Sequence, residues 1–151
     1  MKIFLILLTG ILLLSNISGC ATIKGEMTVF WEKIKGKLTE KRQGTREEAV
    51  RKYNYQGFKD ELIMESPIIT PSIVSSGDEI KQEIQYTLLS PKEENQFKVS
   101  ENVTLSGTEI SIELSKKESK KDQGTHVSVL QFVVPKDLDP GHYELVTGFC
   151  Q

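Results

Sequence analysis

Val127-Ser128-Val129-Leu130-Gln131-Phe132-Val133-Val134 is the most apolar of the strand-like stretches in this 151-residue chain. In an extended strand, successive side chains point to opposite faces. One face here carries Val127, Val129 and Val133, and the other carries Leu130, Phe132 and Val134. A run that is apolar on both faces is typical of a strand that lies centrally in a sheet and is covered on both sides. Pro135 ends the run, because proline has no N–H to donate to a neighbouring strand.

Other segments show the alternation that is typical of half-buried strands. It runs through residues 79–89 and 97–105 and resumes over residues 110–114, after the hairpin signal Ser106-Gly107. The apolar positions are Ile80, Ile84, Tyr86, Leu88, Phe97, Val99, Val103, Leu105, Ile110, Ile112 and Leu114. Together with residues 127–134, these segments predict a mainly β protein, built as an antiparallel β-sandwich.

Two further segments are less regular. Residues 61–74 are extended but contain Pro67 and Pro71, which predicts an edge strand or a strand that switches sheets at Pro67. Residues 115–122 contain lysines and acidic residues and no apolar side chain. Such a run favours a solvated hairpin tip over a basic binding patch.

Residues 28–43 have the period of an amphipathic helix. Phe30, Trp31, Ile34 and Leu38 are spaced by three and four positions, and basic residues lie among them. Near a membrane anchor, such a helix is suited to an anionic bilayer surface. The alternative is a helix that docks its apolar stripe on the downstream domain, and the sequence leaves both open.

A second, shorter helix is predicted over residues 46–55. Thr45 followed three positions later by Glu48 has the pattern of a capping box, which satisfies two backbone N–H groups at a helix start. Gly57 is the expected stop signal, since glycine readily adopts the left-handed conformation after a helix.

The charge and the cysteines exclude several classes of function. The chain has 19 basic and 21 acidic residues and a net charge of −2, so it lacks the excess positive charge that nucleic-acid binding requires. Its two cysteines, Cys20 and Cys150, belong to no CxxC pair and no Cys/His cluster. A zinc site or an attached haem is therefore unsupported.

Catalytic patterns are equally missing from the sequence. Neither His126 nor His142 lies in a nucleophile or metalloprotease motif. Asp137 and Asp139 are only one pair of carboxylates, whereas calcium takes about 6–8 oxygen ligands, and Asp139-Pro140-Gly141 is good turn chemistry. We therefore expect no enzyme activity, no cofactor and no metal.

The N-terminus has the pattern of a secretory signal. Lys2 precedes an apolar block over residues 3–14, and Ile17-Ser18-Gly19-Cys20 follows it. The block is too short for a transmembrane helix, which needs about 20 apolar residues. The order Ile17, Ser18, Gly19, Cys20 resembles the lipobox of bacterial lipoproteins, in which the cysteine receives a diacylglycerol before the signal is cleaved. The resemblance implies lipidation of Cys20, against the alternative of an ordinary signal peptide that happens to meet a cysteine.

This resemblance sets the expected organisation of the chain. Residues 1–19 are the signal peptide, 20–27 a lipid-anchored tether, 28–57 a helical spacer and 58–151 the β-sandwich. The implied location is the bacterial cell envelope. Ala21 in place of aspartate favours, by resemblance to enterobacterial sorting, the outer membrane facing the periplasm if the host is Gram-negative. Acylation of Cys20 would leave Cys150 as an odd thiol, either inert or engaged in an intermolecular disulfide.

A second resemblance lies near the C-terminus. Leu138, Gly141 and Tyr143 are arranged like the E–F corner of immunoglobulin-like and fibronectin type III-like sandwiches, in which a tyrosine hydroxyl bonds back to the main chain. The similarity covers about residues 59–148 and implies an immunoglobulin-like antiparallel β-sandwich. Leu145 stands where antibody domains have a cysteine, and their buried tryptophan is missing. The resemblance therefore implies a disulfide-free bacterial module.

The sequence reaches Gln151 just after the segment that corresponds to strand F, without the usual strand G. Three interpretations stay open: a truncated product, a six-stranded sandwich closed by its N-terminal segment, or a partner that donates the missing strand. The edge around Leu145, Val146 and Phe149 is apolar, and exposed edges pair with other chains. We expect a protein partner there.

Together, these features predict a membrane-anchored envelope lipoprotein whose non-catalytic module binds protein or has a structural role. The alternative is an accessory subunit of an envelope enzyme or transport complex, in which the domain positions a partner. The protein-binding part rests on analogy between folds.

Overall fold

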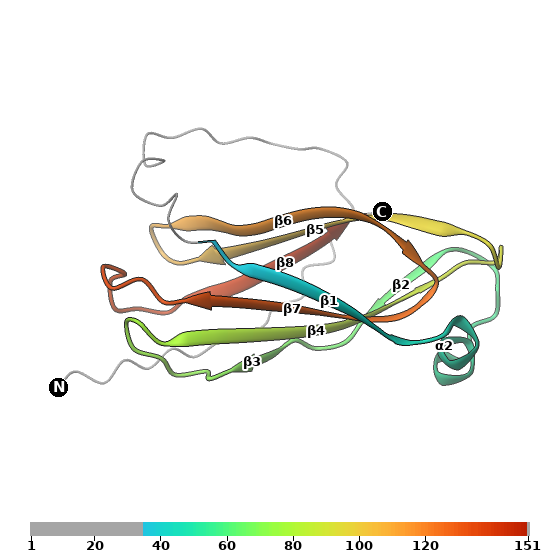
Figure 1. The fold of residues 1–151 in the computed structure, drawn as a ribbon, viewed down its shortest axis with the longest axis horizontal. Helices are drawn as coiled ribbons and strands as arrows, with labels where there is room; N and C mark the ends of the chain where they lie inside the picture. The colour runs from blue at the N-terminus through green and yellow to red at the C-terminus, as the bar shows by residue number, and fades with distance from the viewer. Residues whose placement is uncertain (1–34, 151) are drawn as a thin grey trace.

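The protein is seen in a computed structural model that describes residues 35–150. They form two antiparallel sheets that pack face to face (Figure 1). The elements are β1 (Lys37–Gly44), α2 (Arg46–Tyr53), β2 (Glu61–Met64), β3 (Ile68–Thr70), β4 (Glu79–Leu89), β5 (Gln96–Ser106), β6 (Ser111–Asp122), β7 (Gly124–Val133) and β8 (Glu144–Cys150). Sheet A has the order β1-β7-β4-β2, with β3 also paired to β4, and sheet B has the order β6-β5-β8. The predicted mainly β fold is confirmed.

The space between the sheets holds two apolar clusters. The larger one joins Ile80 and Phe132 of sheet A to Val103 and Leu145 of sheet B. The smaller one is formed by Tyr86, Leu88, Phe97 and Val99. Burying a side chain of this size stabilises the fold by roughly 1.5–3 kcal/mol. The inward positions of β4 and β5 are those that the alternation predicted.

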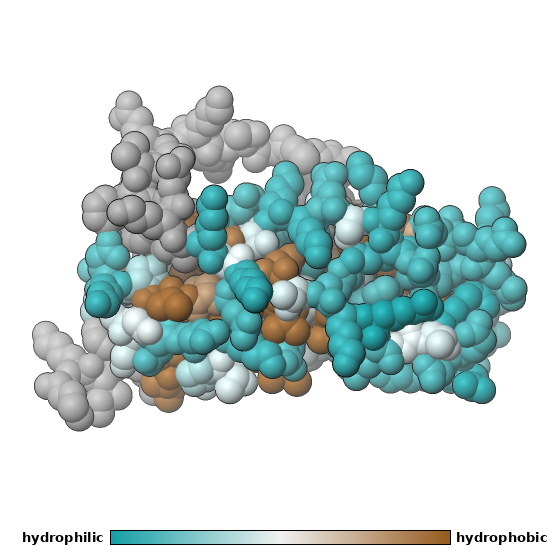
Figure 2. Space-filling view, in the orientation of Figure 1, coloured by the Kyte–Doolittle hydropathy of each residue, from teal (hydrophilic) through white to brown (hydrophobic). Residues whose placement is uncertain are grey.

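β7 is central, as predicted, because it pairs with β1 on one side and β4 on the other. Its outer face, however, is not covered. Val127 and Val129 are partly exposed there, and Val133 is 56% exposed. Figure 2 shows hydrophobic residues on this side among hydrophilic ones. β-Branched residues also suit a half-exposed strand. Valines on both faces of β7 are therefore compatible with an outer face that no other element covers in the described part of the chain.

The helix predicted over residues 28–43 is wrong where the structure describes it. Residues 37–44 form β1, which pairs with β7 from Lys37 to Gly44. Leu38 packs against the larger core cluster. Since β1 belongs to the sandwich, residues 37–57 are no separate helical spacer before it. Residues 28–34 lie outside the described part.

The second predicted helix is confirmed as α2, with its capping box. Thr45 Oγ1 accepts from Glu48 N, and Glu48 Oε2 accepts from Thr45 N at 2.8 Å. The helix ends at Asn54, which has a left-handed φ of 51°, and not at Gly57. Ala49 is its buried residue, and Figure 1 shows α2 at one end of the sandwich, beside β2.

Two further interpretations are decided. β2 and β3 both pair with β4, so the chain interrupted by Pro67 stays at one edge of sheet A and does not switch sheets. The lysine-rich run 115–122 is the last eight residues of β6, paired with β5, and not a hairpin tip. The chain crosses from sheet B to sheet A directly after it, at Gln123.

Candidate functional site

The two sheets have four edges, and three of them carry features that oppose pairing with another chain. β6 has four lysines between positions 116 and 121, and β1 carries Lys37, Lys41 and Arg42. The edge formed by β2 and β3 is broken at Pro67 and ends before Pro71. The β1 and β6 edges also meet, because Gly36 N donates to Leu114 O at 2.9 Å.

The fourth edge is β8, which pairs only with β5 among the described residues. Its sequence, Glu144-Leu145-Val146-Thr147-Gly148-Phe149-Cys150, has a single charge, no lysine and no proline. Every second residue of such a strand presents its N–H and C=O away from its partner. β8 is therefore the candidate site for strand addition.

The predicted edge residues are placed differently along β8. Leu145 points inward and is 9% exposed, so it belongs to the core. Val146 points outward and is 50% exposed. Phe149 is half-buried and lies 4.7 Å from Tyr86, ring centroid to centroid. Of the three side chains, Val146 and part of Phe149 are therefore the most accessible to a partner.

The rim beside this edge is apolar. Leu62 and Met64 of β2 are partly buried and pack against the same cluster as Phe149. A strand added to β8 would place its inward side chains next to this rim. It therefore suits an extended segment with apolar residues at alternate positions.

The corner residues hold the start of β8. Tyr143 Oη donates to Asp139 O at 2.5 Å, and Leu138 packs against the core. A Cβ at Gly107 would lie 2.7 Å from Tyr143 Cε1, so the ring needs a glycine beneath it. Burial raises the pKa of the Tyr143 hydroxyl, which therefore stays protonated and able to donate. The corner thus anchors the chain that leads into the open strand.

A buried polar cluster, which the sequence did not reveal, ties the two sheets at the opposite side. Glu40 of β1 accepts from Tyr86 Oη of β4 and from Lys121 Nζ of β6. The ring of His126 stacks on Tyr86 at 5.4 Å, and its Nε2 lies 2.9 Å from Asp122 O. Burial lowers the pKa of both Lys121 and His126 and raises that of Tyr86. These groups bind one another across the sandwich, which is a structural task.

Two more polar pairs cross the interior. Ser128 Oγ donates to Glu101 Oε1 at 2.5 Å, and Thr147 Oγ1 donates to Gln82 Oε1 at 3.2 Å. Burial raises the pKa of the Glu101 carboxyl, although Ser128 and Lys117 act in the other direction. A polar residue at an inward position of an alternating strand was the available signal. Gln82 stands between two inward isoleucines, and Glu101 between two inward valines.

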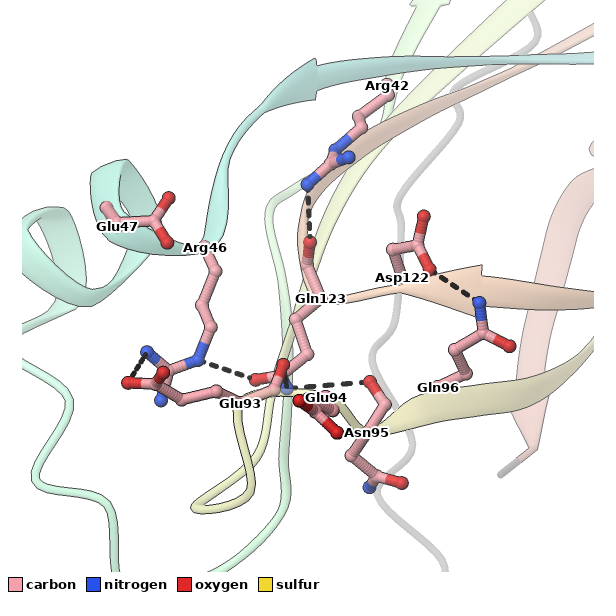
Figure 3. Close-up of a pocket in the computed structure, with 9 residues that line it drawn as sticks. All are labelled: Arg42, Arg46, Glu47, Glu93, Glu94, Asn95, Gln96, Asp122 and Gln123. Carbon is pink, nitrogen blue, oxygen red and sulfur yellow. Dashed lines mark hydrogen bonds and ion pairs between the residues drawn. The ribbon is translucent and has the colours of Figure 1, made fainter.

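A polar pocket of about 290 Å³ lies where α2 meets the loop after β4 (Figure 3). Its lining groups already serve the fold. Gln123 Oε1 accepts from Arg46 Nε and Ser90 N, and its Nε2 donates to Lys92 O and Glu93 O. We interpret this pocket as the joint that fastens the loop to the helix.

The remaining candidates are spread over the molecule. His126 is buried, and Asp137 and Asp139 are exposed around the corner. Cys150 is an exposed free thiol at the end of β8. Within residues 35–150, no group of three or more His, Cys, Asp or Glu side chains is placed to hold a metal ion. The lipobox residues Ile17, Ser18, Gly19 and Cys20 lie outside the described part.

No helix in the described part of the chain has the length and apolar character needed to cross a membrane. We found no match to this chain among protein-family models, curated proteins or solved structures.

Proposed function

We propose that this protein is a lipid-anchored lipoprotein of the bacterial envelope whose sandwich binds an extended segment of a partner protein at β8, without catalysis. The observation that carries the proposal is the contrast between the edges. The β6 edge carries lysines, the β1 edge carries lysines and an arginine, and the β2–β3 edge is interrupted and followed by prolines. β8 instead has an apolar stretch and one acidic residue. Recognition by β-strand addition requires a sheet edge whose backbone N–H and C=O groups are accessible to another strand.

The order of strand pairing supports an immunoglobulin-like identity for the sandwich. Such domains have one sheet of strands A, B, E and D and a second of C, F and G, sometimes extended by C′. Here β2–β3, β4, β7 and β1 stand in the positions of A, B, E and D. β6, β5 and β8 stand in the positions of C′, C and F, and Tyr143 lies just before β8, as a tyrosine corner does. One departure is that the strand in the D position comes first in the chain.

The envelope location and the anchor rest on the sequence of residues 1–20. The apolar block followed by Ile17-Ser18-Gly19-Cys20 supports export and lipidation of Cys20. We infer an outer-membrane location facing the periplasm for a Gram-negative host. With the predicted tether over residues 20–27, the sandwich could contact a partner while Cys20 stays in the membrane.

The buried ionisable groups support a binding role over a catalytic one. A catalytic acid or base has to reach a substrate. Glu40, Lys121 and His126 instead contact one another or Tyr86 inside the sandwich, and Glu101 is bound by Ser128. Burial between the sheets lowers the pKa of Lys121 and of His126 and raises the pKa of the Glu101 carboxyl.

The test compares two valines of similar exposure. The full chain is expressed in bacteria with a photo-crosslinking residue at position 146. After irradiation of the envelope fraction, this residue is expected to capture a discrete protein. The same residue at position 133, on the outer face of β7, should not, because Val133 is 56% exposed but lies off the open edge. Val146→Lys is expected to abolish capture from a photo-crosslinker at Cys150, whereas Val133→Lys should leave it unchanged. Equal capture from positions 146 and 133, or none, would contradict strand addition at β8.

A further inference from the structure

Two copies of β8 that run antiparallel to each other have complementary side chains. The strand runs from Glu144 to Cys150, so its middle residue is Thr147. If a second copy lies antiparallel about Thr147, Leu145 faces the partner's Phe149 and Val146 faces the partner's Gly148. Glu144 faces the partner's Cys150, and Thr147 faces its own equivalent. Because the register pairs odd residues with odd and even with even, inward side chains meet inward ones.

Each pair in this register is favourable or neutral. Leu145 opposite Phe149 is an aliphatic–aromatic pair on the inner face, and Thr147 opposite Thr147 brings two uncharged side chains together. The only charge, Glu144, meets a neutral residue, so no like charges are opposed. Full overlap of the seven residues therefore meets no electrostatic penalty.

The outer face is complementary in shape. Val146 is 50% exposed, and a Cβ added at Gly148 would meet nothing within 4 Å. In the reversed pairing, the exposed valine of each copy lies beside the open position over the other's glycine. This happens twice, once on each side of the twofold axis.

We propose that the partner of β8 is β8 of a second copy of this chain, so that the two sheets B join into one sheet of order β6-β5-β8-β8-β5-β6. This inference rests on the proposed function, since it names the occupant of the edge proposed there. The isologous pairing closes on itself, because each copy uses its open edge once. It leaves the lysine-rich β6 strands at the outer edges, where their charges oppose further growth.

The experiment uses the full chain in membranes, with Cys150→Ser to remove the exposed thiol. Val146→Cys is treated with a bismaleimide that spans about 8 Å, the separation of diagonal neighbours across two strands. A covalent homodimer is expected. Val133→Cys in the same background is the control, because it has the same chemistry and similar exposure away from the edge. Any dimer formed through Cys20 would appear equally in both.

Gly148→Lys added to the Val146→Cys variant provides the decisive comparison. The lysine has room within its own copy but occupies the space into which residue 146 of the other copy would project. We expect unchanged circular dichroism and at least a tenfold loss of homodimer, about 1.4 kcal/mol. A homodimer that persists would overturn the proposed pairing.

The two proposals fail separately. If Val146→Cys gives no homodimer while a photo-crosslinker at 146 captures a different protein, the second copy is excluded and strand addition at β8 stands. If neither crosslink forms, both proposals are wrong. If the homodimer forms and is lost with Gly148→Lys, both are supported.

Discussion

Gln123 joins α2 to the loop after β4 through one side chain. Its amide oxygen accepts from Ser90 N at 2.7 Å and from Arg46 of α2, and its amide nitrogen donates to Lys92 O and Glu93 O. The residue is 3% exposed, so water cannot easily replace these bonds. A glutamine is suited to this position because it both accepts and donates. The joint lies where the chain passes from sheet B to sheet A.

Gln123→Ala is therefore expected to lower the free energy of unfolding by about 2–4 kcal/mol, because several buried groups lose their partners. Chemical denaturation of the purified protein measures this. Gln96→Ala is the matched control, since Gln96 makes an exposed bond to Asp122, and it should cost no more than about 0.5 kcal/mol. Equal losses in the two variants would refute the role of Gln123.

Glu101 makes the stability depend on pH. Burial raises the pKa of its carboxyl in the folded state, so the folded protein binds this proton more tightly than the unfolded chain does. Stability is then lost as the pH rises through the raised pKa. Glu101→Gln removes the ionisation and keeps an oxygen that accepts from Ser128.

The expected result is that Glu101→Gln is more stable than the parent at about pH 8 and equal to it below about pH 4, where the glutamate is protonated in both states. Urea unfolding at a series of pH values measures the difference. Glu113→Gln, an exposed site on β6, should show no such trend. A stability gain that is the same at every pH would contradict this account of Glu101.

At the scale of elements, α2 depends on its first residues. Its capping box satisfies Thr45 N and Glu48 N, and the helix is only eight residues long. Short helices are marginal without such support. Thr45→Ala is expected to cost about 1 kcal/mol, measured by thermal unfolding. Thr108→Ala, in the exposed loop after β5, is the control, and a loss of the same size there would argue against the cap.

The elements that local sequence predicts are those whose pattern is complete within a few residues. The alternation of β4 and β5 and the cap of α2 are of this kind. β1 is not, because Leu38 fits a helical spacing with the residues before it, and its strand partner is remote: Thr39 bonds to Val129, 90 positions away. The lysine run of β6 is similar. Lys121 can turn inward only because Glu40, 81 positions away, receives it.

The candidate site was predictable in part for the same reason. The apolar composition of residues 145–149 is local, so an exposed edge there could be expected from the sequence. Which side of the strand is open is not local. Leu145 faces the core because β5 and β4 bring Leu105 and Ile80 into the same cluster. The rim residues Leu62 and Met64 share a cluster with Phe149 only because one sheet packs on the other.

At the scale of the whole molecule, anchoring and strand addition would reinforce each other. A chain held at one membrane meets other chains of that membrane at a raised effective concentration, so a weak edge interaction can be occupied there. Among residues 35–150, β8 is paired on one side only, and the lipobox is the proposed source of the confinement. Losing the anchor should therefore weaken pairing without changing the fold.

The anchor can be tested with the only two cysteines of the chain. Cys20→Ser is expected to abolish incorporation of a labelled fatty acid and to shift the protein out of the membrane fraction. Cys150→Ser is the matched control and should keep both the label and the location, because Cys150 is a thiol of the folded domain. Label that persists in Cys20→Ser would refute lipidation at the lipobox.

In cells, the β8 homodimer formed by Val146→Cys should decrease with Cys20→Ser, whereas at high concentration in solution it should return.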